Sequence, residues 1–151
     1  KRINHSLNNI KILDIGCGIG GPARFIASDK GCHVIGIDIT ESFVETGNHL
    51  SRLVGLEDQV MLNTGNALAL PFAENEFDAG YMIHLGMNIA DKNQLIGDAA
   101  RVIKPGGQFV IYDFLLHYML HHHNRAELTQ FGLSLFWFQY IHYPRHQYLL
   151  N

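Results

Sequence analysis

Residues 13–21 read LDIGCGIGG, and this stretch decides the fold. Gly16, Gly18 and Gly21 fit the G-x-G-x-x-G spacing of a turn that joins a strand to a helix and lets the backbone approach a ligand closely. Asp14 places a carboxylate two residues ahead of the first glycine. The stretch therefore predicts a strand–turn–helix unit that combines glycines with a negative charge.

The carboxylate of Asp14 bears on which ligand such a turn holds. The N-terminus of a helix carries partial positive charge, which favours anions. The pyrophosphate of NAD would be repelled by Asp14, whereas an amino-acid zwitterion would offer it an ammonium group. S-adenosylmethionine (SAM) has this ammonium group and a cationic sulfonium as well, so the turn favours SAM over NAD. A structural role for Asp14, as an N-cap or turn residue, remains open.

Apolar runs alternate with helical patterns along the chain. Short apolar runs bounded by glycine or polar residues predict buried strands, and apolar residues at helical spacing predict amphipathic helices between them. The predicted strands are 11–15, 33–38, 60–62, 77–83 and 108–114, and the predicted helices run from Pro22 to Gly31, over 41–55 and over 91–104. This alternation predicts an α/β protein with a Rossmann-like, doubly wound, mostly parallel sheet and helices on both faces.

Composition narrows the class of protein. The 151 residues fit one domain, and 11 Lys and Arg against 14 Asp and Glu argue against a nucleic-acid partner. No apolar run reaches the ~20 residues that span a bilayer, so no stable membrane insertion is expected. The first residues lack the apolar stretch of a signal peptide, and Cys17 and Cys32 form no C-x-x-C pair. We therefore expect a cytoplasmic protein with a small-molecule partner; nothing indicates the oligomeric state.

The residues that could bind a ligand follow the predicted strands. Asp14–Gly21, Asp38, Asn66–Ala67 and His84–Asn88 each come after an apolar, strand-like run. In open parallel sheets, ligands bind beyond the carboxyl ends of the strands, so these four loops are expected at one edge of the sheet. Asp38 lies about 20 residues after the glycines, where an acidic residue accepts the ribose hydroxyls of NAD and SAM alike.

Four segments carry a family resemblance. They read ILDIGCGIGGPARFIA, VIGIDITESFVE, GNALALPFAENEFDAGYMIHLGMNIADK and RVIKPGGQFVIYD, and they cover about residues 10–113. In order and spacing they resemble the successive motifs of class I SAM-dependent methyltransferases. GCGIGGPAR and H-x-x-M-N-I-x-D-K resemble the sarcosine/dimethylglycine methyltransferases, while ubiquinone-type C-methyltransferases and sterol or tocopherol methyltransferases share much of the pattern. The resemblance implies methylation of a small molecule, first an amine such as sarcosine or dimethylglycine, alternatively a quinone- or sterol-type carbon.

The resemblance also implies roles for individual residues. The start of the glycine turn would hold the methionine end of SAM, Asp38 the ribose, and Ile39 the adenine ring. Asn66 stands where the family usually has Asp beside the adenine amino group, and its side-chain carbonyl can still accept that hydrogen bond. The cofactor-binding residues implied in this way are Asp14, Gly16, Cys17, Gly18, Asp38, Ile39, Asn66, Ala67 and His84.

His84 is the candidate catalytic residue, because the resemblance places methyl transfer after the fourth predicted strand. A neutral imidazole could orient the acceptor or accept its proton, and the alternative is a structural histidine. Met87 either lines the pocket or packs in the core, and Tyr81 and Tyr112 are expected to be packed aromatics with polar tips. No metal site is expected, because the consecutive His121–His123 cannot all point into one site and lack Cys or carboxylate partners.

Residues 114–151 differ in kind from the rest of the chain. They hold more than half of its aromatic residues and histidines, and FGLSLFWFQYIHY fits neither the helical nor the strand period. We therefore divide the chain into a SAM-binding core, 1–113, and a tail that is either a divergent lid over the acceptor or a non-native C-terminus, with the last strands of the family missing or divergent. Three classes follow: a SAM-dependent methyltransferase, an inactive SAM-binding remnant, and an NAD-dependent dehydrogenase, against which Asp14 and the later motifs argue.

Overall fold

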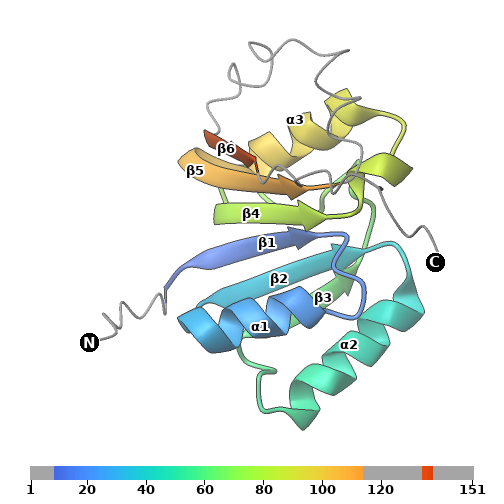
Figure 1. Ribbon diagram of the computed structural model, residues 1–151, viewed down its shortest axis with the longest axis vertical. Coiled ribbons are helices and arrows are strands. Elements are labelled where there is room, and N and C mark those ends of the chain that lie inside the picture. Colours follow the sequence, from blue (N-terminus) through green and yellow to red (C-terminus); the bar gives the residue numbers. More distant parts are fainter. Residues whose placement is uncertain (1–8, 114–133, 138–151) are drawn as a thin grey trace, which may run out of the picture.

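The computed structural model describes residues 9–113 and a short strand at 134–137. The described strands form one sheet in the order β3-β2-β1-β4-β5-β6, and every pairing between them is parallel (Figure 1). The elements in chain order are β1 (Lys11–Ile15), α1 (Gly21–Lys30), β2 (His33–Asp38), α2 (Glu41–Leu53), β3 (Val60–Thr64), β4 (Phe77–Ile83), the 3₁₀ turn η1 (Gly86–Asn88), α3 (Lys92–Val102), β5 (Ile103–Tyr112) and β6 (Ser134–Trp137). The predicted Rossmann-like architecture is confirmed.

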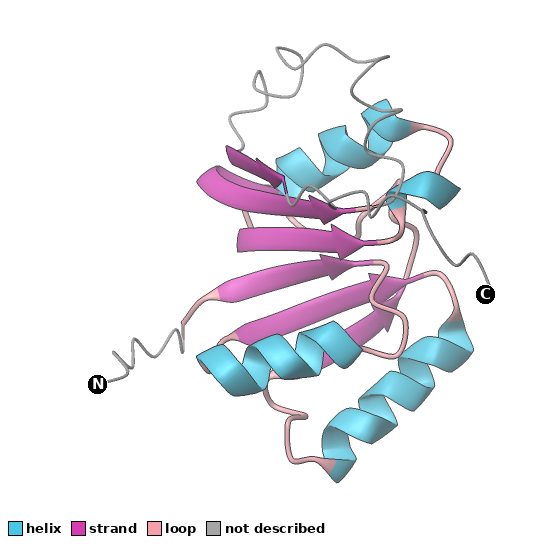
Figure 2. Ribbon diagram, in the orientation of Figure 1, coloured by secondary structure: helices cyan, strands magenta, loops and turns pink. Residues whose placement is uncertain are grey.

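Helices cover both faces of the sheet, as Figure 2 shows. On one face, Ala23 and Ala27 of α1 and Val44 of α2 pack against Val34 and Leu62 of the strands. The side chains of a strand alternate between the two faces, so the neighbouring residues of β1 and β2 point toward α3. Parallel strands buried on both sides read as near-continuous apolar runs, which is why these strands were recognisable in the sequence.

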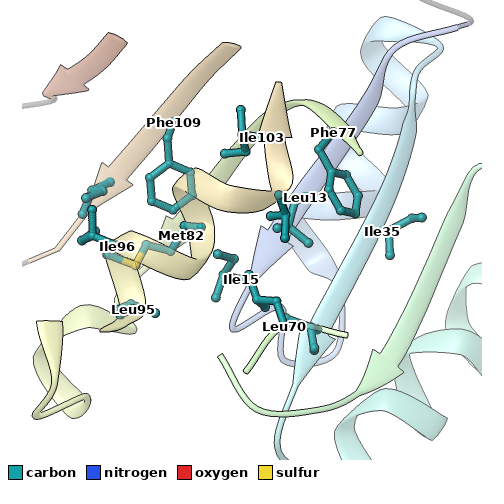
Figure 3. Packing of buried hydrophobic residues seen from close by; sticks show 14 residues of the cluster. Leu13, Ile15, Ile35, Leu70, Phe77, Met82, Leu95, Ile96, Ile103 and Phe109 are labelled. Atoms are coloured by element: carbon teal, nitrogen blue, oxygen red, sulfur yellow. The ribbon is translucent and has the colours of Figure 1, made fainter. Parts of the chain in front are cut away.

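The larger core lies between the sheet and α3 (Figure 3). Leu13 and Ile15 of β1 meet Met82 of β4 and Leu95 of α3, and all four are fully buried or nearly so. Phe77, at the start of β4, closes the cluster at the amino edge of the sheet with its ring edge-on to Phe72. This core fixes the strand ends from which the candidate site is built.

The boundary between α3 and β5 differs from the prediction. The helix was expected to reach Lys104 and the strand to begin at Gln108, but α3 ends at Val102 and β5 begins at Ile103. Phe77 pairs with Ile103 and Ala79 already pairs with Gln108, so the four residues between them bulge opposite one residue of β4. A bulge keeps a strand in register while it carries extra residues, and Pro–Gly–Gly reads in sequence as a break.

The strand β6 was not predicted, because SLFW is too short for its apolar residues to reveal a period. It pairs in parallel with β5, from Gln108↔Ser134 to Ile111↔Trp137. The remaining residues of the tail, His121–His123 included, lie outside the described residues, and the division at residue 113 stays a prediction. In the described part, no helix is long and apolar enough to cross a bilayer, and no three potential ligand side chains gather as they would around a metal ion.

Candidate functional site

The turn after β1 is fastened to the end of β2 by its backbone. The amides of Gly16 and Cys17 both donate to the carbonyl of Ile37, at 2.8 and 3.1 Å. The amide of Gly18 donates to Oδ2 of Asp38 at 2.9 Å. Two of the sequence-predicted regions, the glycine turn and the acid at the end of β2, are therefore in direct contact.

Three glycines of the turn have left-handed backbone conformations, with φ of +78° at Gly16, +52° at Gly18 and +75° at Gly20. The third glycine of the predicted pattern, Gly21, has no such conformation and is the first residue of α1. A Cβ at Gly16 would lie 2.9 Å from Leu85, whereas a Cβ at Gly18 would meet nothing within 4 Å. The backbone at Gly18 is therefore open to a ligand.

The helix α1 begins where the turn ends. Its N-cap is Gly20, no side chain caps it, and its first turn holds Pro22 and no acidic residue. The amide groups and dipole of such a helix start favour a negatively charged ligand group, such as a carboxylate. Together with the open backbone at Gly18, this end of the turn suits the carboxylate of an amino acid.

Asp38 connects three loops. Its Oδ2 accepts from Gly18, its Oδ1 accepts from the amide of Thr40 at 2.9 Å, and its main-chain carbonyl accepts from Gly65 at 2.9 Å. Each carboxylate oxygen can accept a second hydrogen bond, which leaves capacity for two hydroxyl groups. The next residue, Ile39, is 75% exposed at the same edge of the sheet, which makes it available to an aromatic ring.

Asn66 and Ala67 lie in the loop after β3, next to Gly65. Oδ1 of Asn66 accepts from the amide of Leu68 at 2.9 Å, and the residue is exposed. The predicted acceptor atom is thus engaged in a local turn, and its second lone pair and the side-chain NH₂ group are what remain for a ligand. Ala67 is half-buried and packs against the core beside α3.

An ion pair on α3 holds this loop in place. Asp98 and Arg101 are joined by a 2.7 Å bond from Nε to Oδ1. Asp98 also accepts from the amide of Leu70, while the two Nη atoms of Arg101 donate to the carbonyls of Phe72 and Leu70, at 2.7 and 2.9 Å. Oδ2 of Asp98 and both Nη atoms of Arg101 therefore bind the loop that carries Asn66, while Nε and Oδ1 hold the two side chains together.

Asp14 lies beneath the glycine turn rather than on its surface. It is 2% exposed, and its Oδ2 accepts a 2.8 Å hydrogen bond from the hydroxyl of Tyr81. Burial raises the pKa of Asp14, the hydrogen bond from Tyr81 lowers it and the charge of Asp38 raises it, and together they bring this pKa to about 7. The sequence missed this partner, because Tyr81 was expected only to pack.

His84 follows directly after β4 and has a φ of +54°, which is unusual for a residue other than glycine. Its amide donates to the carbonyl of Tyr112 at 2.8 Å. The two rings are edge-on, with centroids 5.0 Å apart and planes at 61°. The ends of β4 and β5 thus fix His84 at the same edge of the sheet as the glycine turn, which itself touches Leu85.

The loop that continues from His84 is held by two charged side chains. Oδ2 of Asp113 accepts from the amide of Met87 at 2.9 Å. Nζ of Lys92 donates to the carbonyls of Gly86 and Ile89. Lys92 is the last residue of the H-x-x-M-N-I-x-D-K stretch, but the sequence assigned it no role. The contact of Asp113 was not predicted, because no spacing in the sequence relates residue 113 to this loop.

Comparison with known proteins identifies the family. Residues 13–111 match the model of the methyltransferase domain. The chain is 37% identical over 107 residues to the sterol 24-C-methyltransferase of Yarrowia lipolytica, which covers 71% of this chain and 28% of that protein.

Two solved structures share the fold. A protein described as a sarcosine dimethylglycine methyltransferase from Galdieria sulphuraria has a TM-score of 0.68 and 29% identity, covering 69% of this chain and 38% of that one. The geranyl diphosphate C-methyltransferase of Streptomyces coelicolor, solved with S-adenosyl-L-homocysteine, has a TM-score of 0.66 and 26% identity, covering 69% and 39%.

The match has a limited span, since the chain covers 28% of the length of the sterol methyltransferase. The glycine turn, the acid at the end of β2 and the loop after β4 all lie within the matched residues. The expected methyl donor of this family, SAM, agrees with the ligands of the geranyl diphosphate methyltransferases, solved with SAM or its demethylated product. This chain belongs to the class I SAM-dependent methyltransferases.

Proposed function

We propose that this chain binds SAM at the carboxyl edge of its sheet and transfers the methyl group to a small-molecule acceptor. The main support for the proposal is the contact between Gly18 and Asp38. It combines backbone that is open to a ligand with a carboxylate that still has acceptor capacity. The exposed side chain of Ile39 completes a surface suited to a nucleoside.

The residues present fit the parts of SAM in turn. The start of α1 suits the carboxylate of the methionine end, and the buried Asp14 supplies the negative charge that favours its ammonium group. Asp38 would accept the ribose hydroxyls, and Ile39 would pack on the adenine. Asn66 and the backbone beside it would face the edge of that ring.

When bound, SAM supplies an electrophilic methyl carbon attached to a sulfonium. The chain therefore needs to align an acceptor behind that carbon, exclude water and accept the proton that the acceptor loses. Alignment of this kind lowers barriers by up to roughly 7–11 kcal/mol in favourable intramolecular models. The loop after β4, which Asp113 and Lys92 hold in place, would present the acceptor.

His84 is the residue that we assign to the acceptor's proton. Its strained backbone is supported by the hydrogen bond to Tyr112, and such outliers occur preferentially at functional sites. A neutral imidazole can accept the proton of an amine or orient it for attack. Replacement by alanine is expected to lower turnover about 10²–10⁴-fold and to leave SAM affinity nearly unchanged.

Two classes of acceptor are supported. An amine such as sarcosine or dimethylglycine agrees with the GMNIADK stretch after His84 and with the Galdieria structure. A carbon acceptor of sterol type is supported by the relatives named sterol 24-C-methyltransferases, at 34–38% identity. A cytoplasmic location and the lack of a nucleic-acid partner remain predictions.

Binding of SAM and NAD, measured separately by calorimetry, tests the cofactor. We expect SAM and S-adenosylhomocysteine to bind and NAD not to bind. Asp14→Ala should weaken SAM binding by about 1–3 kcal/mol, and Asp58→Ala, which removes an exposed carboxylate between α2 and β3, should have no effect. Tight binding of NAD, or unchanged SAM affinity in a folded Asp14→Ala variant, would contradict the proposal.

Transfer of a labelled methyl group tests the acceptor and the role of His84. Sarcosine, dimethylglycine, a quinol precursor and a sterol are assayed side by side with the unchanged chain, His84→Ala and His49→Ala. His49 is exposed on α2 and serves as the control. Transfer to the sterol or quinol alone would overturn the amine assignment, and full activity of His84→Ala would remove this residue from the mechanism.

A further inference from the structure

Asp14 and Tyr81 are register partners on neighbouring parallel strands, β1 and β4. Side chains of register partners lie on the same face of a sheet, so these two side chains are direct neighbours. The hydroxyl of Tyr81 reaches Oδ2 of Asp14 at 2.8 Å, and Tyr81 is itself only 7% exposed. The bond is therefore built by the sheet and shielded from water.

The other neighbour of Asp14 across the sheet is Gly36 of β2. A side chain there has no room, because a Cβ would lie 2.6 Å from Leu62 and 2.7 Å from Cys17. On the β2 side, Asp14 thus faces a residue without a side chain. On the β4 side it faces the hydroxyl of Tyr81, which determines how the carboxylate is oriented.

We propose that Tyr81 is a positioning residue whose hydrogen bond favours the ionised form of Asp14 beneath the glycine turn, and so sets the pH range in which the chain binds SAM. The inference rests on the proposed binding of SAM. Tyr81 acts through Asp14, and no contact between Tyr81 and the ligand is part of the proposal.

The charged and titratable groups around Asp14 come from three elements. Asp38, the last residue of β2, is a like charge, Cys17 belongs to the turn, and Tyr81 belongs to β4. Burial raises the pKa of Cys17 to about 12, so its thiol remains neutral. Burial and the carboxylate of Asp14 also raise the pKa of the Tyr81 hydroxyl, which therefore remains a donor.

The pKa of Asp14, at about 7, places its ionisation within the range of ordinary assays. An ammonium group is attracted to the ionised form, so affinity for SAM should rise as the pH passes through this pKa. Without the hydroxyl of Tyr81, the ionised form loses a stabilising hydrogen bond and the pKa of Asp14 increases. The rise in affinity then moves to higher pH.

The first test needs no ligand. Aspartate carboxyl carbons labelled with ¹³C are followed by NMR from pH 5 to 9 in the unchanged chain and in Tyr81→Phe. We expect the midpoint of Asp14 to increase in the variant. Asp14→Asn identifies the signal by its disappearance. An unchanged midpoint in a folded Tyr81→Phe variant would overturn the inference, whether or not the chain binds SAM.

The second test measures binding by calorimetry at pH 6, 7, 8 and 9. The probes are S-adenosylhomocysteine, which carries the ammonium group, and 5′-methylthioadenosine, which lacks the amino acid. Near pH 7, Tyr81→Phe should weaken the first about 2–5-fold, as expected when a pKa near 7 increases by about half a unit to one unit, and should leave the second within about twofold. The difference should narrow at pH 9. In the Asp14→Asn background, Tyr81→Phe should have no further effect.

The outcomes separate this inference from the proposed function. Failure of the unchanged chain to bind S-adenosylhomocysteine would overturn both. Binding with the same pH profile in Tyr81→Phe would overturn the role of Tyr81 alone. Equal weakening of both probes at every pH would show that Tyr81 only supports the fold, which also contradicts the inference.

Discussion

The turn after β1 and the loop after β4 meet at one edge of the sheet, but they are built differently. The turn is held by main-chain hydrogen bonds to Ile37 and by three glycines with left-handed conformations. The loop is held by the side chains of Asp113 and Lys92. The left-handed glycines of the turn produce a spacing that can be recognised in the sequence. The bond of Asp113 to Met87 joins residues 26 positions apart and produces no local pattern.

The two regions also differ in how their charged side chains are buried and paired. The carboxylate beneath the turn, Asp14, is buried and shares its surroundings with the like charge of Asp38. The charges around the loop each satisfy main-chain groups of that loop. The turn therefore holds a group whose burial opposes folding, and the loop holds groups whose hydrogen bonds favour it.

The largest expected effect concerns Asp14. The pKa of Asp14 in the folded chain, about 7, lies above the ordinary value of 3.8 for an aspartate, so the carboxyl group favours folding at low pH and this contribution is lost as the pH rises toward 7. Asp14→Asn should therefore stabilise the ligand-free chain by an amount that grows by about 2–3 kcal/mol between pH 5 and 8. Urea denaturation at several pH values measures this difference.

Asp58→Asn, at an exposed position, serves as the control and should change the free energy of unfolding by less than ~0.5 kcal/mol at every pH. If Asp14→Asn increased the free energy of unfolding by the same amount at every pH, the ionised carboxylate beneath the turn would not oppose folding, and the contrast with the loop would be wrong.

The next effect concerns the point where turn and loop touch. Gly16→Ala introduces a left-handed alanine, at about 1–2 kcal/mol, and an overlap with Leu85, at about 1 kcal/mol more. Gly18→Ala carries the conformational cost without the overlap, since the space around it is open. Thermal unfolding compares the two, and Gly16→Ala should be the less stable. Leu85→Ala should relieve the extra cost of Gly16→Ala; if the two substitutions are merely additive, the regions are not coupled there.

Asp113→Ala tests the main support of the loop. It leaves the amide of Met87 without its acceptor, and the expected loss is about 1–2 kcal/mol in unfolding free energy. Hydrogen exchange should accelerate at the amide of Met87 while that of Gly16 stays protected. Equal acceleration at both amides would show that turn and loop open as one unit.

Lys92→Met should have the smallest effect, about 0.5–1 kcal/mol. Its Nζ donates to two carbonyls of a partly exposed loop, which water can satisfy in its place, and methionine keeps most of the apolar stem. Chemical denaturation measures the loss. A loss as large as that of Asp113→Ala would mean that the loop depends on its cation as much as on its carboxylate.

The sequence predicted the strands well and their junctions less well. The bounds of β1, β2 and β4 were correct, because buried parallel strands are continuous apolar runs that end at glycine or polar residues. The start of β5 was wrong by five residues, since Lys104–Gly107 reads as a break and forms a bulge. The pattern also placed its third glycine at Gly21, whereas the left-handed residue is Gly20.

The candidate site was predictable where the chain itself brings residues together. Asp14, Gly16, Gly18 and Asp38 lie at the carboxyl ends of β1 and β2 or just after them, and these strands are neighbours in a doubly wound sheet, so the proximity of the residues could be inferred from the alternation of elements. The bond between Asp14 and Tyr81 could not, because it depends on the register of β1 against β4. A shift of one residue would have turned Tyr81 to the other face of the sheet.

The three hydrogen bonds of Asp38 affect how any variant at this position must be interpreted. Because the carboxylate also accepts from the amides of Gly18 and Thr40, its removal releases the turn and the start of α2 together, while the bond from Gly65 to the main-chain carbonyl is kept. Asp38→Ala is therefore expected to lower ligand affinity in either case, whether the ribose contacts the carboxylate itself or contacts only the turn that the carboxylate supports. Ligand analogues that lack one hydroxyl, measured against the unchanged chain, separate the two, because they alter the contact and leave the scaffold intact.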